Sequence, residues 1–185
     1  MRITSCRSWD GLVLVDNDLI SNAWMLNFDF RGMGDCSIYE EDIAYSRCCF
    51  FVEKLHDTIL AYETNPMAKE LGEKLTTSIF TLPEVPLDIN LGAAILNKFV
   101  MISEGKLEFT RLSITSKLSD SITSHIGFED LEHFEWLYNE PPGTQWFTKP
   151  DASVNDKDMS WESVNLSWDE KLNIPEDLGM VIEME

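Results

Sequence analysis

The sequence is poor in basic residues. Its 185 residues include 14 lysines and arginines against 33 aspartates and glutamates, for a net charge of −19. A protein that binds nucleic acid directly needs clustered basic side chains to neutralise phosphates, so this class is excluded. The chain also lacks any run near 18 consecutive apolar residues, which excludes a membrane-spanning helix. Hydrophobic residues make up 44% of the chain and aromatic residues 11%, which is typical of a folded protein.

Cysteines and targeting signals are also scarce. The four cysteines are Cys6, Cys36, Cys48 and Cys49, and none belongs to a C-x-x-C pair. A chain of this length builds a core without disulfides, so we expect reduced thiols and no structural zinc. Residues 1–10 carry positive charge but no apolar stretch of the length that a secretory signal needs. We therefore expect a cytoplasmic protein.

Motifs for nucleophilic and nucleotide chemistry are missing as well. No G-x-S-x-G segment occurs, and the S-x-x-K match at Ser103 and Lys106 falls in an expected turn rather than on a helix. Residues 32–37 place two glycines between an expected strand and an expected helix, as a dinucleotide-binding turn would. Acidic neighbours such as Asp35 and Glu40 would repel a pyrophosphate. We therefore expect a plain turn and no nucleotide cofactor.

Candidate metal ligands are few. Glu129 and His133 have the i, i+4 spacing of a helical ligand pair, but no second such pair completes a site. Residues 151–162 match part of a calcium-binding loop. Position 6 of that loop is Asp156, where glycine is needed, and Pro150 denies the entering helix. We expect no metal and no other cofactor, although weak cation binding by this acidic loop stays open.

Alternation with a period of two dominates the first thirty residues. Residues 12–15 follow a turn signal at Asp10–Gly11, and they form a short apolar run. From Trp24 to Phe30, large apolar residues alternate with smaller or polar ones, which predicts a half-buried strand. The sheet is therefore expected to begin near the N-terminus.

Helical signals come next. Ser37 and Glu40 form a capping-box pattern ahead of apolar residues at spacings of three and four, which predicts a helix from about 38 to 63. A second helix is predicted to begin at Pro66 and to run to about Leu75. Residues 79–86 are expected to be extended, because two prolines bar a helix interior.

The middle of the chain predicts a hairpin and a further helix. Residues 99–103 and 106–110 flank a Glu104–Gly105 turn signal, and a change of parity after Arg111 predicts a bulge. An apolar stripe predicts a third helix from about 128 to 138. Together the elements predict an α+β fold, in which an antiparallel sheet packs against two or three helices and a loop-rich acidic segment follows.

The C-terminal segment differs in composition from the rest. Residues 141–175 are rich in proline, aspartate, asparagine and serine, yet they include Trp146, Trp161 and Trp168. We expect these rings to anchor an ordered segment. The expected organisation is a single domain, with an α+β core over 1–140 and an acidic, tryptophan-containing segment over 141–185 packed on it.

Negative charge is concentrated in the last third. Residues 126–185 hold fifteen acidic and three basic residues, which gives this third a charge of −12. A net charge of −19 destabilises the folded chain through repulsion between like charges, a cost that selection for solubility alone would seldom tolerate. The tryptophans that lie among these acidic residues are typical of binding interfaces. We therefore expect a surface that binds a basic partner protein, with a merely solvated surface as the alternative. The candidate partner-binding residues are Glu129, Asp130, Glu132, Glu135, Trp136, Trp146, Asp156, Asp158, Trp161, Glu162, Asp169 and Glu170.

A small, cytoplasmic, very acidic chain without catalytic motifs has the physical profile of an inhibitor protein. The leading hypothesis is an immunity protein that neutralises a cognate basic, nuclease-type bacterial toxin by occluding its active site. The first alternative is a phage-encoded DNA mimic that inhibits a restriction or CRISPR nuclease. An alternative from another class is a small enzyme that uses unpaired carboxylates such as Glu129 and Glu132, which would require a deep pocket with shifted carboxyl pKa values. The oligomeric state stays open.

Overall fold

A computed structural model of the chain describes residues 2–75, 77–120, 122–139, 141, 143–153 and 159–169. In these residues a six-stranded sheet has the order β4-β3-β1-β2-β5-β6. The strands are β1 (Ile3–Val15), β2 (Asp18–Gly32), β3 (Ile59–Tyr62), β4 (Ile79–Leu82), β5 (Leu107–Ser116) and β6 (Thr123–Gly127). The α-helices are α1 (Ile38–Glu53), α2 (Pro66–Lys74) and α3 (Asp88–Ser103). Short 3₁₀ helices follow as η1 (Glu129–His133), η2 (Glu135–Tyr138), η3 (Trp146–Thr148) and η4 (Glu162–Val164).

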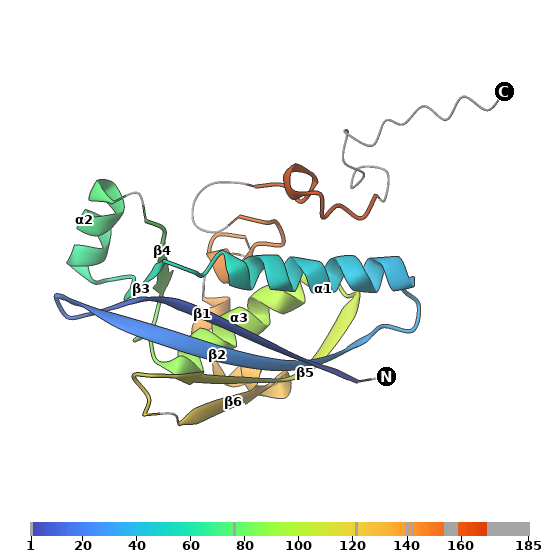
Figure 1. Cartoon of the computed structure of the whole chain (residues 1–185), viewed down its shortest axis with the longest axis horizontal. Helices are drawn as coiled ribbons and strands as arrows, with labels where there is room; N and C mark the ends of the chain where they lie inside the picture. The colour runs from blue at the N-terminus through green and yellow to red at the C-terminus, as the bar shows by residue number, and fades with distance from the viewer. Residues whose placement is uncertain are drawn as a thin grey trace.

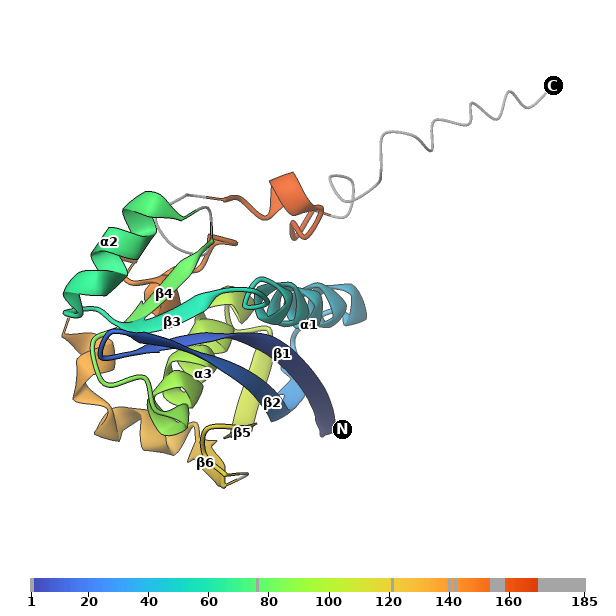
Figure 2. The same cartoon turned by 60° about the vertical axis from the view of Figure 1, so that its left-hand side comes forward.

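The predicted α+β class is confirmed, but the sheet is mixed rather than wholly antiparallel. The pairs β1–β2, β2–β5 and β5–β6 are antiparallel, whereas β3 runs parallel to both β1 and β4. Helices α1 and α3 cover one face of the sheet, where the aromatic core lies (Figure 1). Helix α2 packs on the opposite face of β1 and β3, through Ala68 against Leu14, Ile59 and Ala61 (Figure 2).

The long β1–β2 hairpin shows the predicted alternation. Trp24, Leu26, Phe28 and Phe30 are all buried against the helices. The turn predicted at Asp10–Gly11 is wrong, because β1 runs straight through it. Gly11 instead allows the backbone just before β3 to lie close to β1, because a Cβ at this position would lie only 2.8 Å from the carbonyl oxygen of Thr58.

Helix α1 begins as predicted and ends earlier. The Ser37–Glu40 capping box is present, with the Ser37 side chain accepting from the Glu40 amide. The predicted continuation to residue 63 is wrong, because the helix ends at Glu53 and residues 59–62 pair with β1 and β4. Sheet pairing outcompetes the helical spacing of these apolar residues. The prediction for α2 is confirmed, with Asn65 as its N-cap.

The predicted hairpin over 99–110 is half wrong, because residues 99–103 are the end of α3. This helix is apolar on nearly every side and fills the centre of the core, so it lacks the polar face that identifies a surface helix. Gly92 allows its close approach to the sheet, since a Cβ there would lie 2.6 Å from the Ile126 side chain. The second predicted strand exists as β5 and pairs with β2. The predicted bulge is confirmed: Asp29 of β2 pairs with Arg111 and the next residue, Phe30, pairs with Phe109, so Thr110 has no partner on β2.

The described parts of residues 143–169 are held on the core by buried polar contacts. The Trp146 ring stacks on Phe51 at 5.6 Å, and its Nε1 donates to the carbonyl of Thr81 at 2.8 Å. The buried Lys98 Nζ donates to three backbone carbonyls of residues 149–153, at 2.8, 3.1 and 3.5 Å. These contacts agree with aromatic anchoring of the segment, while the division into a 1–140 core and a 141–185 segment stays a prediction.

Candidate functional site

Phe128 is the large exposed apolar side chain between β6 and η1. The chain turns there because the Asp130 carboxylate accepts a hydrogen bond from the Gly127 amide at 2.7 Å. Leu131 is buried beneath this turn and fixes η1 to the core. In a 3₁₀ helix, side chains three residues apart point the same way, so Glu129 and Glu132 lie side by side.

Two hollows adjoin Phe128. One has a volume of about 520 Å³ and is lined by Met33, Val100, Gly105, Leu107, Glu108, Phe109, Thr110, Phe128 and Glu129. The other has a volume of about 300 Å³ and is lined by Asn97, Val100, Phe128, Glu129, Leu131, Glu132 and Tyr138. The two linings share Val100, Phe128 and Glu129. We refer to the two hollows and their lining residues as the Phe128 surface.

The charges on the Phe128 surface have one sign. Its lining includes Glu108, Glu129 and Glu132, and no lysine, arginine or histidine. Glu108 is neutralised by Arg31, whose Nε and Nη2 each donate to it at 2.8 Å. The His133 Nε2 lies 4.0 Å from the carboxylate of its neighbour Glu132, and both side chains are largely exposed. Glu129 and Glu132 therefore present negative charge to water.

The exposed aromatic rings differ from the predicted ones. Phe128 is 51% exposed and Tyr138 61% exposed, and both line the smaller hollow. The sequence pattern predicted that Phe128 belongs to the buried stripe of a single helix over 128–138. In the structure this region forms two short 3₁₀ helices that meet at Phe134, and Phe128 precedes the first of them with its ring exposed.

Two of the tryptophans expected at a partner interface lie in the core instead. Trp146 is 4% exposed and Trp161 is 6% exposed, so neither offers its ring to a partner, and the prediction is corrected for both. Trp136 is half-buried and packs edge-on against Phe134 and Phe147. The sequence alone did not distinguish buried tryptophans from interface tryptophans, because both kinds occur among polar and acidic residues in a loop-rich segment.

The predicted acidic residues do not form one face. Glu129, Asp130, Glu132 and Glu135 lie on or beside η1 and η2, which follow β6, whereas Glu162 and Asp169 lie on a segment on the side of α1 away from the sheet (Figure 1). We call this segment, residues 159–169, the C-terminal strap. Its Glu162 is exposed, and a backbone hydrogen bond and the Ser160 side chain lower its pKa. Asp156, Asp158 and Glu170 lie outside the described residues.

Arg47 explains the position of the strap. This arginine of α1 is buried, and its guanidinium lies 3.7 Å from the ring centre of Trp168 and 4.6 Å from that of Trp161. It donates to the carbonyl of Leu166 at 2.9 Å and to the carboxylate of Glu104 at 2.8 Å. Burial lowers the Arg47 pKa, and the Glu104 hydrogen bond opposes this. Trp161 and Trp168 therefore hold the strap on the core.

The chemistry of the Phe128 surface favours binding over catalysis. The Glu132 side chain is 78% exposed, so water screens its charge, whereas a catalytic carboxylate is usually desolvated. In the described part of the chain, no three histidine, cysteine, aspartate or glutamate side chains are grouped so that they could hold a metal ion. None of the helices described there combines the length and apolar composition that a membrane span requires.

Comparison with known proteins adds no relative. No model of a known protein family matches the chain, and no curated protein matches its sequence.

Proposed function

We propose that the protein binds a basic partner protein through the Phe128 surface. One observation carries this proposal: two exposed aromatic rings stand beside adjoining hollows whose lining includes carboxylates and no basic side chain. Exposed aromatic residues next to a pocket are typical of the energetic centre of an interface. Carboxylates around them favour a partner with lysine or arginine at matching positions.

The two kinds of residue are expected to act on different steps of binding. Phe128 and Tyr138 supply apolar area that leaves water when a partner covers them, so they slow dissociation. Glu129 and Glu132 attract a basic partner over a distance of about one Debye length, so they speed association, and salt weakens this effect. The large negative charge of the whole chain adds to this attraction.

Within this proposal, the chain acts in the cytoplasm as an inhibitor, as an immunity protein does against a basic nuclease-type toxin. Enzymes that cut nucleic acid carry a positively charged groove for the phosphates, and an acidic protein with an apolar anchor complements such a groove. A phage-encoded DNA mimic that blocks a defence nuclease uses the same physics. Only the identity of the partner separates these two.

Capture of the partner tests the proposal. The full chain is immobilised and exposed to lysate from the source cell and its mobile elements, and retained proteins are eluted by rising salt. The expected result is a basic protein that the wild type retains and Phe128→Ala loses, with a dissociation constant about 30- to 1,000-fold weaker, equivalent to about 2–4 kcal/mol. Ile38→Ala is the matched control, because Ile38 is an exposed apolar residue on α1.

A charge-matched pair of variants separates the acidic contribution from net charge. The double variant Glu129→Gln, Glu132→Gln is expected to slow association with the partner. The control is the double variant Glu63→Gln, Glu73→Gln, which removes the same charge from exposed positions, one just before α2 and one on it. This control is expected to leave the association rate nearly unchanged. Addition of the chain to the purified partner is expected to abolish the activity of that partner. Equal capture by wild type and Phe128→Ala would place the interface elsewhere. Failure to retain any basic protein at low salt would refute the proposal.

A further inference from the structure

A third hollow lies at the other end of α3 from the Phe128 surface. Its volume is about 470 Å³, within the range of roughly 300–1,000 Å³ that is typical of sites for small molecules. It opens where the parallel strands β1 and β3 end, which is the edge of a sheet at which ligands commonly bind. It is lined by Val13, Leu14, Val15, Asp16, Ile20, Asn22, Tyr62, Asn65, Val85, Pro86, Leu87, Asp88, Ser116, Leu118 and Ser119.

The apolar part of the lining is left open to water. Val15, Val85, Leu87 and Leu118 are all exposed, and they come from three separate segments that meet at this hollow: the end of β1, the β4–α3 loop and the β5–β6 loop. Large apolar side chains that gather in this way cost free energy in water, because their burial against a ligand is worth roughly 25 cal/mol per Å². The hollow therefore favours a ligand with an apolar body.

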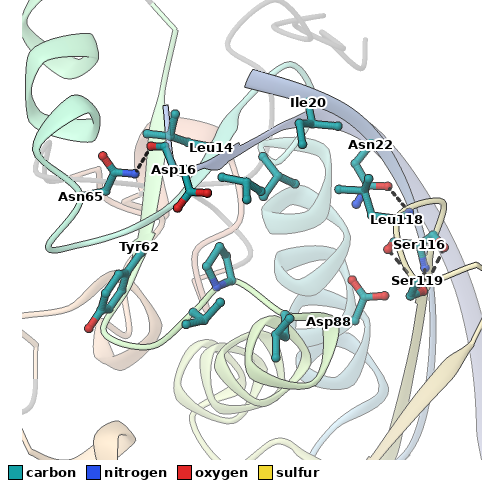
Figure 3. Close-up of a pocket in the computed structure, with 15 residues that line it drawn as sticks. Leu14, Asp16, Ile20, Asn22, Tyr62, Asn65, Asp88, Ser116, Leu118 and Ser119 are labelled. Carbon is teal, nitrogen blue, oxygen red and sulfur yellow. Dashed lines mark hydrogen bonds between the residues drawn. The ribbon is translucent and has the colours of Figure 1, made fainter. Parts of the chain in front are cut away.

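The walls are held in place by hydrogen bonds. Asn65 Nδ2 donates to the carbonyl of Asp16 at 2.7 Å, and Asn22 Oδ1 accepts from the amide of Leu118 at 3.1 Å (Figure 3). Asp16 has a positive φ of 53°, which this contact with Asn65 stabilises. These hydrogen bonds fix the loops that form the walls of the hollow.

Asp88 carries an unsatisfied group in this lining. Its Oδ2 has almost no contact with solvent and no hydrogen-bond partner among the described residues. A buried carboxylate oxygen without a donor is costly, and such atoms call for an explanation. No lysine, arginine or histidine lines the hollow, whereas a second carboxylate, that of Asp16, does (Figure 3). Because this oxygen is closed to water-sized groups, a ligand in the hollow meets Asp88 only through the atoms that line it, and the two carboxylates, with no basic side chain beside them, favour a cationic ligand.

We propose that this hollow binds a small organic amine, with its ammonium group at Asp88 and its alkyl or aromatic body against Val85, Leu87 and Leu118. The ammonium group balances the charge of the Asp88 carboxylate, which has no cationic partner in the lining. The apolar body covers the side chains that are otherwise exposed. Anions of the same shape are repelled by Asp16 and Asp88. This site is separate from the Phe128 surface and does not depend on the proposed partner.

Three probes of one shape test the charge requirement. The full chain is titrated with cyclohexylmethylamine, cyclohexylmethanol and cyclohexanecarboxylate near neutral pH, and binding is followed by NMR shifts of backbone amides. The amine is expected to shift amides of residues 85–91 and 116–119 and to bind at least about tenfold more tightly than the alcohol. The carboxylate is expected not to bind. Equal affinity for amine and alcohol would overturn the proposal and leave an apolar crevice only.

Variants of Asp88 test its role. Asp88→Asn is expected to weaken amine binding by about 10- to 100-fold, as the loss of a charge-assisted hydrogen bond does, and to leave alcohol binding nearly unchanged. Glu84→Gln removes the same charge from an exposed position four residues earlier, outside the lining, and serves as the matched control. Leu118→Ala is expected to weaken amine and alcohol together. Amine shifts spread over surface carboxylates, or equal amine binding by Asp88→Asn and wild type, would refute the site.

Discussion

Replacing Arg47 by alanine is expected to release the C-terminal strap and to lower the free energy of unfolding by about 3 kcal/mol. The Arg47 side chain is 2% exposed, and the carboxylate of its partner Glu104 is 43% exposed. Its guanidinium donates to Glu104 and to the carbonyls of Leu166 and Ile102, and it lies against two tryptophan rings. The variant removes all of these contacts at once.

The magnitude follows from opposing contributions. Each hydrogen bond from a charged donor contributes about 1.5–3 kcal/mol, and stacking on an aromatic ring about 0.5–2 kcal/mol. Burial of the guanidinium costs several kcal/mol and offsets much of this gain. Removal of one partner from a buried charged network typically costs about 3–5 kcal/mol. The lower end applies to Arg47, because water can solvate Glu104 once the arginine is gone.

Two measurements check this prediction. Urea unfolding followed by tryptophan fluorescence reports the free energy of unfolding, and hydrogen exchange reports the protection of residues 161–168. Loss of exchange protection in the strap, together with the lower stability, is the expected result. Lys69→Met is the control, because it removes one positive charge from an exposed position on α2, away from the strap. A change within about 0.5 kcal/mol of wild type, with the strap still protected, would refute the reasoning.

Three further predictions concern titration and binding. Burial lowers the pKa of Lys98 to about 7, whereas in the unfolded chain it is about 10.4, so folding releases a proton between these values. The free energy of unfolding of the wild type, minus that of Lys98→Met, is therefore expected to rise from pH 7 to pH 9 by up to about 1.4 kcal/mol per pH unit. Urea unfolding measures both values, and a difference that does not change with pH would contradict the prediction. The Lys106 hydrogen bond and that of Ser37 hold the pKa of Glu40 at about 2, and ¹³C NMR of Lys106→Met should show it returning toward its ordinary value. Phe128→Ala should leave stability nearly unchanged in urea unfolding while it weakens partner binding; a large loss of stability would make Phe128 a core residue.

Local patterns in the sequence determined several elements correctly. The alternation from Trp24 to Phe30 predicted a strand because one of its faces is buried and the other meets water. The capping residues Ser37 and Asn65 marked the starts of α1 and α2, because the orphan amides of a helix start are satisfied by neighbours in the chain. The α+β class followed from these elements. The excess of acidic residues is likewise a property of composition alone.

Contacts between distant segments decided the rest. Residues 59–62 carry helical spacing, yet they join the sheet because β1 and β4 supply hydrogen bonds on both sides. The end of α3, residues 99–103, was predicted as a strand because burial on all sides removes the polar face that reveals a helix period.

The functional residues depended on the same distant contacts. Trp146 and Trp161 are buried by α1 and β4, which lie far from them in the chain, while Phe128 stays exposed at the turn between β6 and η1. The hollow that brings Asp16 and Asp88 together exists only because separate segments of the chain meet around it. Charge and local propensity are fixed residue by residue, whereas exposure is a property of the folded chain, because it depends on which segments come to cover each side chain.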